Sequence, residues 1–195
     1  MVVDPRADRR ATGEPCSRRL LLTGGAGAAT AALLSACSGA KPLREKVRGG
    51  GKVSRADVAP LNTLLDVEHY AIAAYAAGIP LLHSPQAESG IQFLAQELAH
   101  AVALSDLVRK VKGKPHRPRA SYDLGHPQSA AEVLSLFQHV EQAQLRTYLA
   151  TLPRLQGPGS RSAAVSIMAN DAQHLAMLRW QSGESPTPAP LVTGS

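Results

Sequence analysis

Apolar residues recur at steps of three and four in four segments of the chain, which is the period of amphipathic helices. The first segment runs from about Pro60 to Gly78, and the second from about Pro85 to Lys112. The third begins near Ser129 and stops at Pro153, and the fourth runs from about Ser160 to Ser182. Few stretches alternate as half-buried strands do, so the sequence predicts an all-α fold.

Local signals mark where these helices begin. The first helix is expected to begin at about Pro60, with an earlier start at Ser54 as the alternative. Ser84 followed by Pro85 has the pattern of an N-cap with proline at the first helical position. Ser129 and Glu132 form a capping-box pattern, in which each side chain satisfies a backbone N–H at the start of a helix.

The lengths of the connections predict how the helices are arranged. The first and second helices, and the third and fourth, are joined by short connections, so each pair is expected to form an antiparallel hairpin. The connection over residues 113–128 is longer and rich in proline. About 16 residues, at up to ~3.3–3.6 Å each, can run the length of a helix of about 25 residues. The sequence therefore predicts a four-helix bundle of two hairpins joined by one long crossover.

An internal repeat supports this arrangement, because the inward positions of the first hairpin recur in the second. The pairs at a step of 73 residues are Leu61 and Leu134, Leu64 and Phe137, Glu68 and Glu141, Ile72 and Leu145, Tyr75 and Tyr148, and Ile79 and Leu152. The pairs at a step of 74 residues are Phe93 and Ile167, Glu97 and Asp171, His100 and His174, and Leu104 and Leu178. Two such hairpins about a pseudo-twofold axis would bring equivalent side chains to the centre.

Acidic residues and histidines interrupt the apolar faces at positions where leucine would fit the pattern better. Residues at i and i+3 share one helix face, so Glu-x-x-His can give an oxygen and a nitrogen to one metal ion. Four carboxylates balance the charge of two divalent ions, and oxygen-rich ligands with imidazole suit iron or manganese. A buried hydrogen-bond network is the alternative interpretation. The residues concerned are Glu68, Glu97, His100, Glu141, Asp171 and His174.

The first 36 residues have the pattern of an export signal. Ser17-Arg18-Arg19-Leu20 is a twin-arginine pattern, and the Ala-, Gly- and Leu-rich residues 21–36 follow it. Residues 34–37, Leu-Ser-Ala-Cys, resemble a lipobox, which predicts cleavage before Cys37 and lipidation of its thiol. The expected location is the outer side of the cytoplasmic membrane, periplasmic or at the cell surface. An uncleaved signal anchor and a plain signal peptide are the alternatives.

The remaining segments complete the predicted domain organisation. The whole chain carries a net charge of +6 at pH 7, and residues 37–53 form a basic linker that would lie against anionic headgroups or remain solvated. The bundle is expected over residues 54–183, and residues 184–195 form a Pro-rich tail. Nucleic acid is a disfavoured partner, because the basic runs lack interleaved aromatic residues. With Cys16 removed and Cys37 lipidated, no thiolate would remain to bind metal.

The motifs around the charged positions resemble those of the ferritin-like superfamily, in particular the exported ferritin-like domain proteins of bacteria. They are LDVEHYAIAAY, ELAH, HVEQAQ and DAQH, and the resemblance covers residues 54–183. It implies that Glu68, Glu97, His100, Glu141, Asp171 and His174 bind two metal ions, iron or manganese. Asp171 departs from the family pattern, which has Glu there. Its shorter side chain would coordinate more distantly or through water and leave one metal position weaker or empty.

Two classes of function follow from this resemblance. The first is a di-metal redox enzyme that acts on dioxygen or peroxide, as a ferroxidase or in peroxide removal. The second is a lipoprotein that sequesters metal, or serves a structural or stress-protective role, without turnover. A homodimer is a possible assembly in either case. Tyr75 and Tyr148 are interpreted as packing residues whose hydroxyls reach polar neighbours, with redox-active phenols as the alternative. The other histidines are interpreted as flanking or loop residues; they are His69, His83, His116, His126 and His139.

Overall fold

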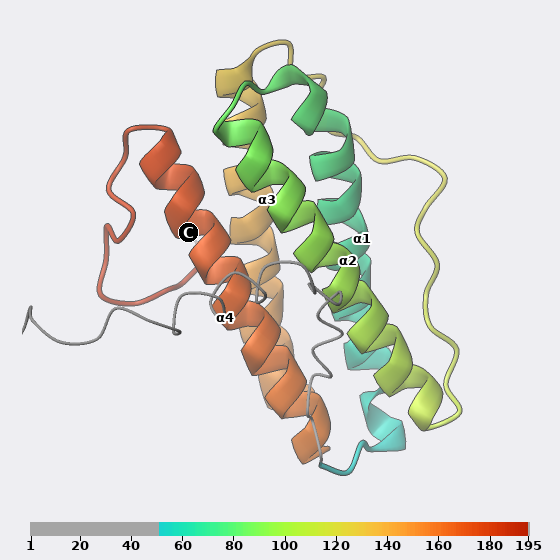
Figure 1. Cartoon of the computed structure of the whole chain (residues 1–195). Helices are drawn as coiled ribbons and strands as arrows, with labels where there is room; N and C mark the ends of the chain where they lie inside the picture. The colour runs from blue at the N-terminus through green and yellow to red at the C-terminus, as the bar shows by residue number, and fades with distance from the viewer. Residues whose placement is uncertain (1–50, 195) are drawn as a thin grey trace, which may run out of the picture. The chain divides into compact units, whose positions relative to one another are not determined.

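The computed structural model describes residues 51–194 of the chain. Four long helices lie in one bundle (Figure 1): α1 (Val58–Gly78), α2 (Gln86–Lys110), α3 (Ala130–Thr151) and α4 (Pro158–Gln181). Residues 51–194 contain no strand, so the predicted all-α four-helix bundle is confirmed. None of the described helices combines the length and apolarity needed to cross a membrane. The predicted export signal and Cys37 lie outside the described residues.

The two hairpins and the crossover have the predicted arrangement. Short 3-10 turns, Ile79–Leu81 and Leu152–Arg154, follow α1 and α3, and each leads into a helix that runs back along its partner (Figure 1). Between α2 and α3 the chain runs the length of the bundle in an irregular segment. Asn62 fastens this segment to α1, since its amide nitrogen donates to the Lys114 carbonyl at 3.0 Å and its oxygen accepts from the His116 N–H at 2.8 Å.

The helix starts differ in how they are capped. Ser54 caps a 3-10 turn, Arg55–Asp57, that leads into α1 through a complete capping box. The Ser129 hydroxyl accepts from the Glu132 N–H, which is one half of the predicted capping box, but the Glu132 carboxylate accepts from the Gln128 N–H at 2.6 Å and not from that of Ser129. The prediction for α2 was wrong: Pro85, not Ser84, occupies the N-cap position, and no side chain caps it. The Ser84 hydroxyl donates instead to a carboxylate oxygen of Glu88 at 2.6 Å, so it does not bond the backbone N–H groups at the start of α2.

The end of α2 also departs from the sequence prediction. Helix α2 ends at Lys110, two residues earlier than expected, and Lys112 takes a left-handed φ of 59°. The turn brings Gly113 against Val58, where a Cβ atom would lie 2.7 Å from the valine side chain. A residue without a side chain therefore lets the crossover leave α2 close to the start of α1.

The core consists of two apolar clusters with a charged layer between them. The first cluster contains Leu61, Leu64, Leu65, Leu104, Val108, Tyr148, Leu155 and Ile167. The second contains Ala71, Ala74, Tyr75, Phe93, Phe137, Val140 and Leu178. The six predicted ligand residues occupy the helix turns between the two sets. The apolar clusters close this layer from both ends of the bundle, which lowers its access to water.

Candidate metal centre

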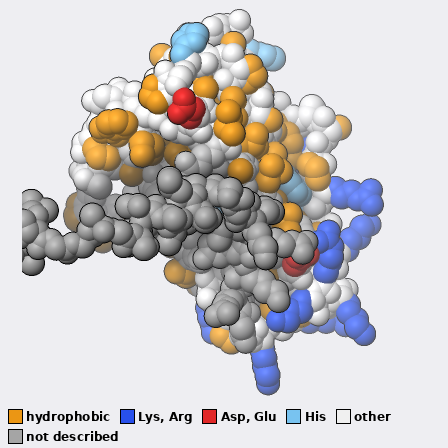
Figure 2. All heavy atoms as spheres, viewed as in Figure 1, with side chains coloured by type: hydrophobic (Ala, Val, Ile, Leu, Met, Phe, Trp, Pro, Cys, Tyr) orange, Lys and Arg blue, Asp and Glu red, His pale blue; other side chains and the backbone are white. Residues whose placement is uncertain are grey.

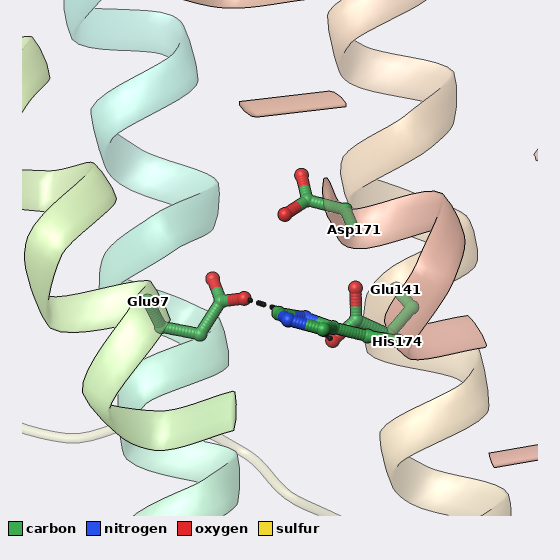
Figure 3. A group of neighbouring side chains, drawn as sticks. All are labelled: Glu97, Glu141, Asp171 and His174. Carbon is green, nitrogen blue, oxygen red and sulfur yellow. Dashed lines mark hydrogen bonds and ion pairs between the residues drawn. The ribbon is translucent and has the colours of Figure 1, made fainter. Parts of the chain in front are cut away.

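All four helices contribute buried charged side chains to one layer of the bundle. The four carboxylates, Glu68, Glu97, Glu141 and Asp171, have no exposed surface. His174 is 1% exposed and His100 is 9% exposed, so the layer opens slightly only on the His100 side. Figure 3 shows Glu97 from α2, Glu141 from α3 and Asp171 and His174 from α4 pointing toward one another.

The two imidazoles mark two neighbouring groups of potential ligands. Nδ1 of His174 lies 3.2 Å from Oε1 of Glu97 and 3.2 Å from Oε1 of Glu141. Nδ1 of His100 lies 3.4 Å from Oε2 of Glu68, 3.4 Å from Oδ1 of Asp171 and 3.8 Å from Oε1 of Glu97. One group joins Glu97, Glu141, Asp171 and His174, and the other joins Glu68, Glu97 and His100. Glu97 belongs to both, so its carboxylate stands between the two positions.

Two tyrosines hold the lone glutamates from across the bundle. The Tyr75 hydroxyl on α1 donates to Oε1 of Glu141 on α3 at 2.5 Å. The Tyr148 hydroxyl on α3 donates to Oε1 of Glu68 on α1, also at 2.5 Å. Each tyrosine is fully buried. The pattern is reciprocal because both the donors and the acceptors are related by the 73-residue repeat. It agrees with the interpretation of these tyrosines as packing residues with bonded hydroxyls.

Two glutamines also support the centre, and the sequence analysis missed both. Nε2 of Gln144 donates to Oε2 of Glu97 at 2.8 Å. Oε1 of Gln96 lies 2.5 Å from Nε2 of His174, whose ring stacks on Phe93 with centroids 4.2 Å apart. Gln144 follows Glu141 at i+3, a spacing that places both on one helix face and was the available signal. These contacts fix the orientation of one carboxylate and one imidazole.

Six buried ligand atoms of the centre have no hydrogen-bond partner among the described residues. Leaving a buried polar atom unpaired costs about 1–3 kcal/mol, and more for a charged group. A cation at the centre would remove this cost, because oxygen and imidazole nitrogen are ligands of iron and manganese. The donor set therefore fits a dinuclear metal site. The atoms are Oε2 of Glu68, Oε1 of Glu97, Nδ1 of His100, Oε2 of Glu141 and both carboxylate oxygens of Asp171.

Burial and mutual repulsion raise the pKa values of three of the four carboxylates, whereas the imidazoles lower that of Glu97. Burial, with the nearby Glu97 charge, raises the pKa of Glu68 to about 8 and that of Glu141 to about 7. Burial and the three other carboxylates raise the pKa of Asp171. Burial also acts against the charge of Glu97, but the nearby imidazoles of His100 and His174 outweigh it and lower its pKa. Glu97 is thus the carboxylate that stays ionised most readily.

The imidazoles hold protons in the absence of metal. Burial acts against their charged forms, yet Glu68 and Glu97 raise the pKa of His100 to about 10. Glu141 and Glu97 likewise raise the pKa of His174 to about 9. At neutral pH, therefore, protons occupy the positions that a cation would take, and they compensate part of the carboxylate charge.

The remaining histidines lie outside the centre. His116 is exposed, and its Nδ1 lies 3.0 Å from the Asp66 carboxylate. His69 is half-buried, while His83, His126 and His139 are exposed. Within residues 51–194, both groups of three or more clustered metal-binding side chains belong to the layer already described.

Comparison with known proteins places this architecture. The profile of the ferritin-like domain family matches residues 56–184. A conserved hypothetical protein from Mycobacterium tuberculosis has a similar structure, with a TM-score of 0.62, 19% identity and coverage of 67% of this chain and 99% of that one. Ferritin-like diiron-carboxylate proteins from Bacillus anthracis str. Ames give a TM-score of 0.54, 14% identity and coverage of 67% and 99%.

A third structural relative is a dodecameric thioferritin, the bacterioferritin-related protein from Bacteroides fragilis. Its TM-score is 0.57, with 20% identity and coverage of 69% of this chain and 90% of that one. No functionally curated protein matches the chain in sequence. At these identities the structural likenesses establish the fold, while the profile match spans more than half of the chain. The chain therefore belongs to the ferritin-like domain family.

Proposed function

We propose that the centre binds two divalent ions, iron or manganese, and that the loaded protein oxidises Fe(II) or removes peroxide. The observation that carries this proposal is the convergence of six buried ligand atoms that have no hydrogen-bond partner among the described residues. Glu68, Glu97 and His100 would hold one ion. Glu97, Glu141, Asp171 and His174 would hold the other. The description of the Bacillus anthracis relatives as diiron-carboxylate proteins favours iron.

Iron or manganese would supply Lewis acidity and one-electron chemistry toward dioxygen or peroxide. The protein would orient the ligands. Each tyrosine hydroxyl holds one glutamate oxygen, so the second oxygen stays available. The amide of Gln144 holds Oε2 of Glu97 and leaves Oε1 toward the centre. Oε1 of Gln96 can only accept, so Nε2 of His174 would keep its proton in the loaded protein, and Nδ1 would give up its proton and offer its lone pair to the ion.

We also propose that the protein works on the outer side of the cytoplasmic membrane, held by lipidated Cys37. The twin-arginine and lipobox patterns of residues 17–37 support this location. A homodimer stays part of the proposal, and the dodecameric relative from Bacteroides fragilis is an example of assembly on this fold.

Sequestration of metal without turnover is the second candidate function. Asp171 favours it, because its carboxylate is shorter than the family's Glu and neither of its oxygens has a hydrogen-bond partner. A protein that holds its second ion weakly would bind iron or manganese without supporting two-electron chemistry. Turnover separates the two candidates.

The test is metal content and turnover of the full chain. After reconstitution with Fe(II) or Mn(II) and removal of free ion, we expect close to two ions per chain, as measured by elemental analysis. Glu97→Gln should remove most of the metal, whereas Glu88→Gln, which changes an exposed carboxylate on the same helix, should not. Fewer than one ion per chain in both forms would overturn metal binding. If the protein binds metal but consumes neither dioxygen nor peroxide, metal sequestration remains as the function.

A further inference from the structure

The exposed basic residues of the bundle gather at one end. We propose that this end, here called the basic end, docks on an anionic lipid surface. Ten of the twelve Lys and Arg residues between 51 and 194 belong to it, and all ten are exposed. Figure 2 shows Lys and Arg side chains gathered on the side where α2 ends. The residues are Lys52, Arg55, Arg109, Lys110, Lys112, Lys114, Arg117, Arg119, Arg154 and Arg161.

Contacts between distant segments show that these residues share one end. The Gly159 N–H, in the first turn of α4, donates to the Lys52 carbonyl at 3.1 Å. The Asn62 amide, in the second turn of α1, donates to the Lys114 carbonyl just beyond α2. The Asp57 carboxylate accepts from the Gln156 N–H in the α3–α4 turn at 2.7 Å. The start of α1, the end of α2 and the α3–α4 turn therefore meet (Figure 1).

Acidic residues do not neutralise the basic end. Asp57 is fully buried, and Asp106 pairs with a single arginine, Arg109, at 3.0 Å. Asp66 faces His116 inside an open cavity of about 770 Å³ that Lys114, Arg117 and Arg119 also line. This cavity has the charge to accept a phosphate headgroup. At the opposite end of the bundle, acidic residues outnumber basic ones: the acidic residues are Glu88, Glu132 and Glu184, and the basic residue is Arg179.

The position of the chain entry favours a membrane over other polyanions. The described chain begins at Gly51, which lies against Gly159 at the basic end. Residues 38–50 can span at most about 50 Å, so a lipid anchor at Cys37 would keep this end near the bilayer. Each Lys or Arg close to an anionic leaflet adds attraction. The described residues of the basic end expose no Phe, Tyr or Trp, which stacking on nucleic-acid bases would use.

The test compares two variants of equal net charge in the full chain carrying Cys37→Ser, which removes the lipid. The first is Lys110→Gln/Lys112→Gln/Lys114→Gln. The control, Ala76→Glu/Gln92→Glu/Ala131→Glu, changes exposed positions toward the opposite end by the same charge. Binding to phosphatidylcholine vesicles, with and without phosphatidylglycerol, is measured by co-sedimentation.

We expect the first variant to lose about tenfold or more of its affinity for vesicles containing phosphatidylglycerol, and the control to lose little. Arg117→Gln/Arg119→Gln should weaken binding in the same direction. Equal weakening of the first variant and the control would mean that only net charge matters and would overturn the proposal. Binding that ignores phosphatidylglycerol would also overturn it, as would loss of duplex DNA binding in the first variant with vesicle binding intact.

Discussion

Gln144 on α3 donates a hydrogen bond of 2.8 Å to Glu97 on α2, and this contact has no counterpart in the other half of the bundle. The 74-residue step relates Glu97 to Asp171, and the 73-residue step relates Gln144 to Ala71. Ala71 is buried and has no polar group, and Asp171 has no hydrogen-bond partner among the described residues. The two halves of the centre therefore differ at two linked positions. Glu97 is the longer carboxylate and accepts a hydrogen bond from Gln144, whereas Asp171 is shorter and has only His100 at an ion-pair distance, 3.4 Å.

Removing the amide of Gln144 should loosen the held carboxylate. We expect Gln144→Ala to destabilise the metal-free protein by about 1–3 kcal/mol, because Oε2 of Glu97 would be buried without a partner. Metal affinity should fall by about 10–100-fold, the usual effect of losing a contact that orients a ligand. Urea unfolding and metal titration measure the two effects. Gln142→Ala, at a half-buried position on the same helix, is the control, and an equal loss there would contradict the assignment.

Asp171 should make the two metal positions unequal. We expect two binding steps of different affinity in a titration with Mn(II) or Fe(II). Asp171→Glu should bring the two affinities closer, since the longer side chain extends the carboxylate by one methylene into the layer. Asp171→Asn should weaken the second step further by removing the charge. Two equal steps in the unmodified protein would show that the shorter carboxylate binds as well as glutamate.

The two tyrosines give a test of symmetry. Tyr75→Phe and Tyr148→Phe each remove the phenol donor of one buried glutamate oxygen, at a cost of about 1–3 kcal/mol in the metal-free protein. The loss in chemical denaturation should be smaller for Tyr75→Phe, because Oε1 of Glu141 keeps Nδ1 of His174 at 3.2 Å, whereas Oε1 of Glu68 is bonded by Tyr148 alone. Turnover, if present, should fall only as far as metal occupancy falls. A large loss of turnover at full occupancy would instead indicate a redox role for the phenol.

Loading the centre should release protons. At pH 7 the raised pKa values of Glu68 (about 8), His100 (about 10) and His174 (about 9) mean that these groups hold protons which a cation must displace. Affinity should therefore rise with pH up to about 9–10 and fall under acid conditions. Calorimetric titration in two buffers of different ionisation enthalpy measures the protons released. Binding at pH 7 without proton release would contradict the protonated state described for the metal-free centre.

The repeat explains how much of the centre was predictable. Equivalent positions in two copies of a hairpin must meet about the same axis, so the charged interruptions at Glu68, Glu97, Glu141 and Asp171 could be placed together from spacing alone. Gln96 and Gln144 were missed because glutamine is common on solvated helix faces, and the repeat gives neither a second glutamine: it relates Gln96 to Asn170 and Gln144 to Ala71. The prediction that Ser84 caps α2 was wrong because its hydroxyl bonds the Glu88 side chain instead. The Ser-Pro pattern alone does not show which of the two bonds the hydroxyl makes.

Asp57 was also missed, and it makes the clearest prediction for acid stability. Its carboxylate accepts from the Gln156 N–H at 2.7 Å, the Gly157 N–H at 3.0 Å and the Ser160 hydroxyl at 2.6 Å, so it ties the start of α1 to the α3–α4 turn. Burial acts against its charge, but these hydrogen bonds prevail and lower its pKa below 3.8.

A carboxylate with a lowered pKa contributes stability that is present above its unfolded pKa and lost as pH falls through the folded value. Asp57→Asn should therefore cost about 2–3 kcal/mol near neutral pH, because an amide would direct donors at backbone N–H groups. The difference from the unmodified protein should shrink steadily below pH 3.8. Urea unfolding across this range measures it. Asp106→Asn, an exposed ion pair, should cost less than about 1 kcal/mol. A difference between Asp57→Asn and the unmodified protein that stays constant down to pH 2 would show that the hydrogen bonds do not depend on the charge.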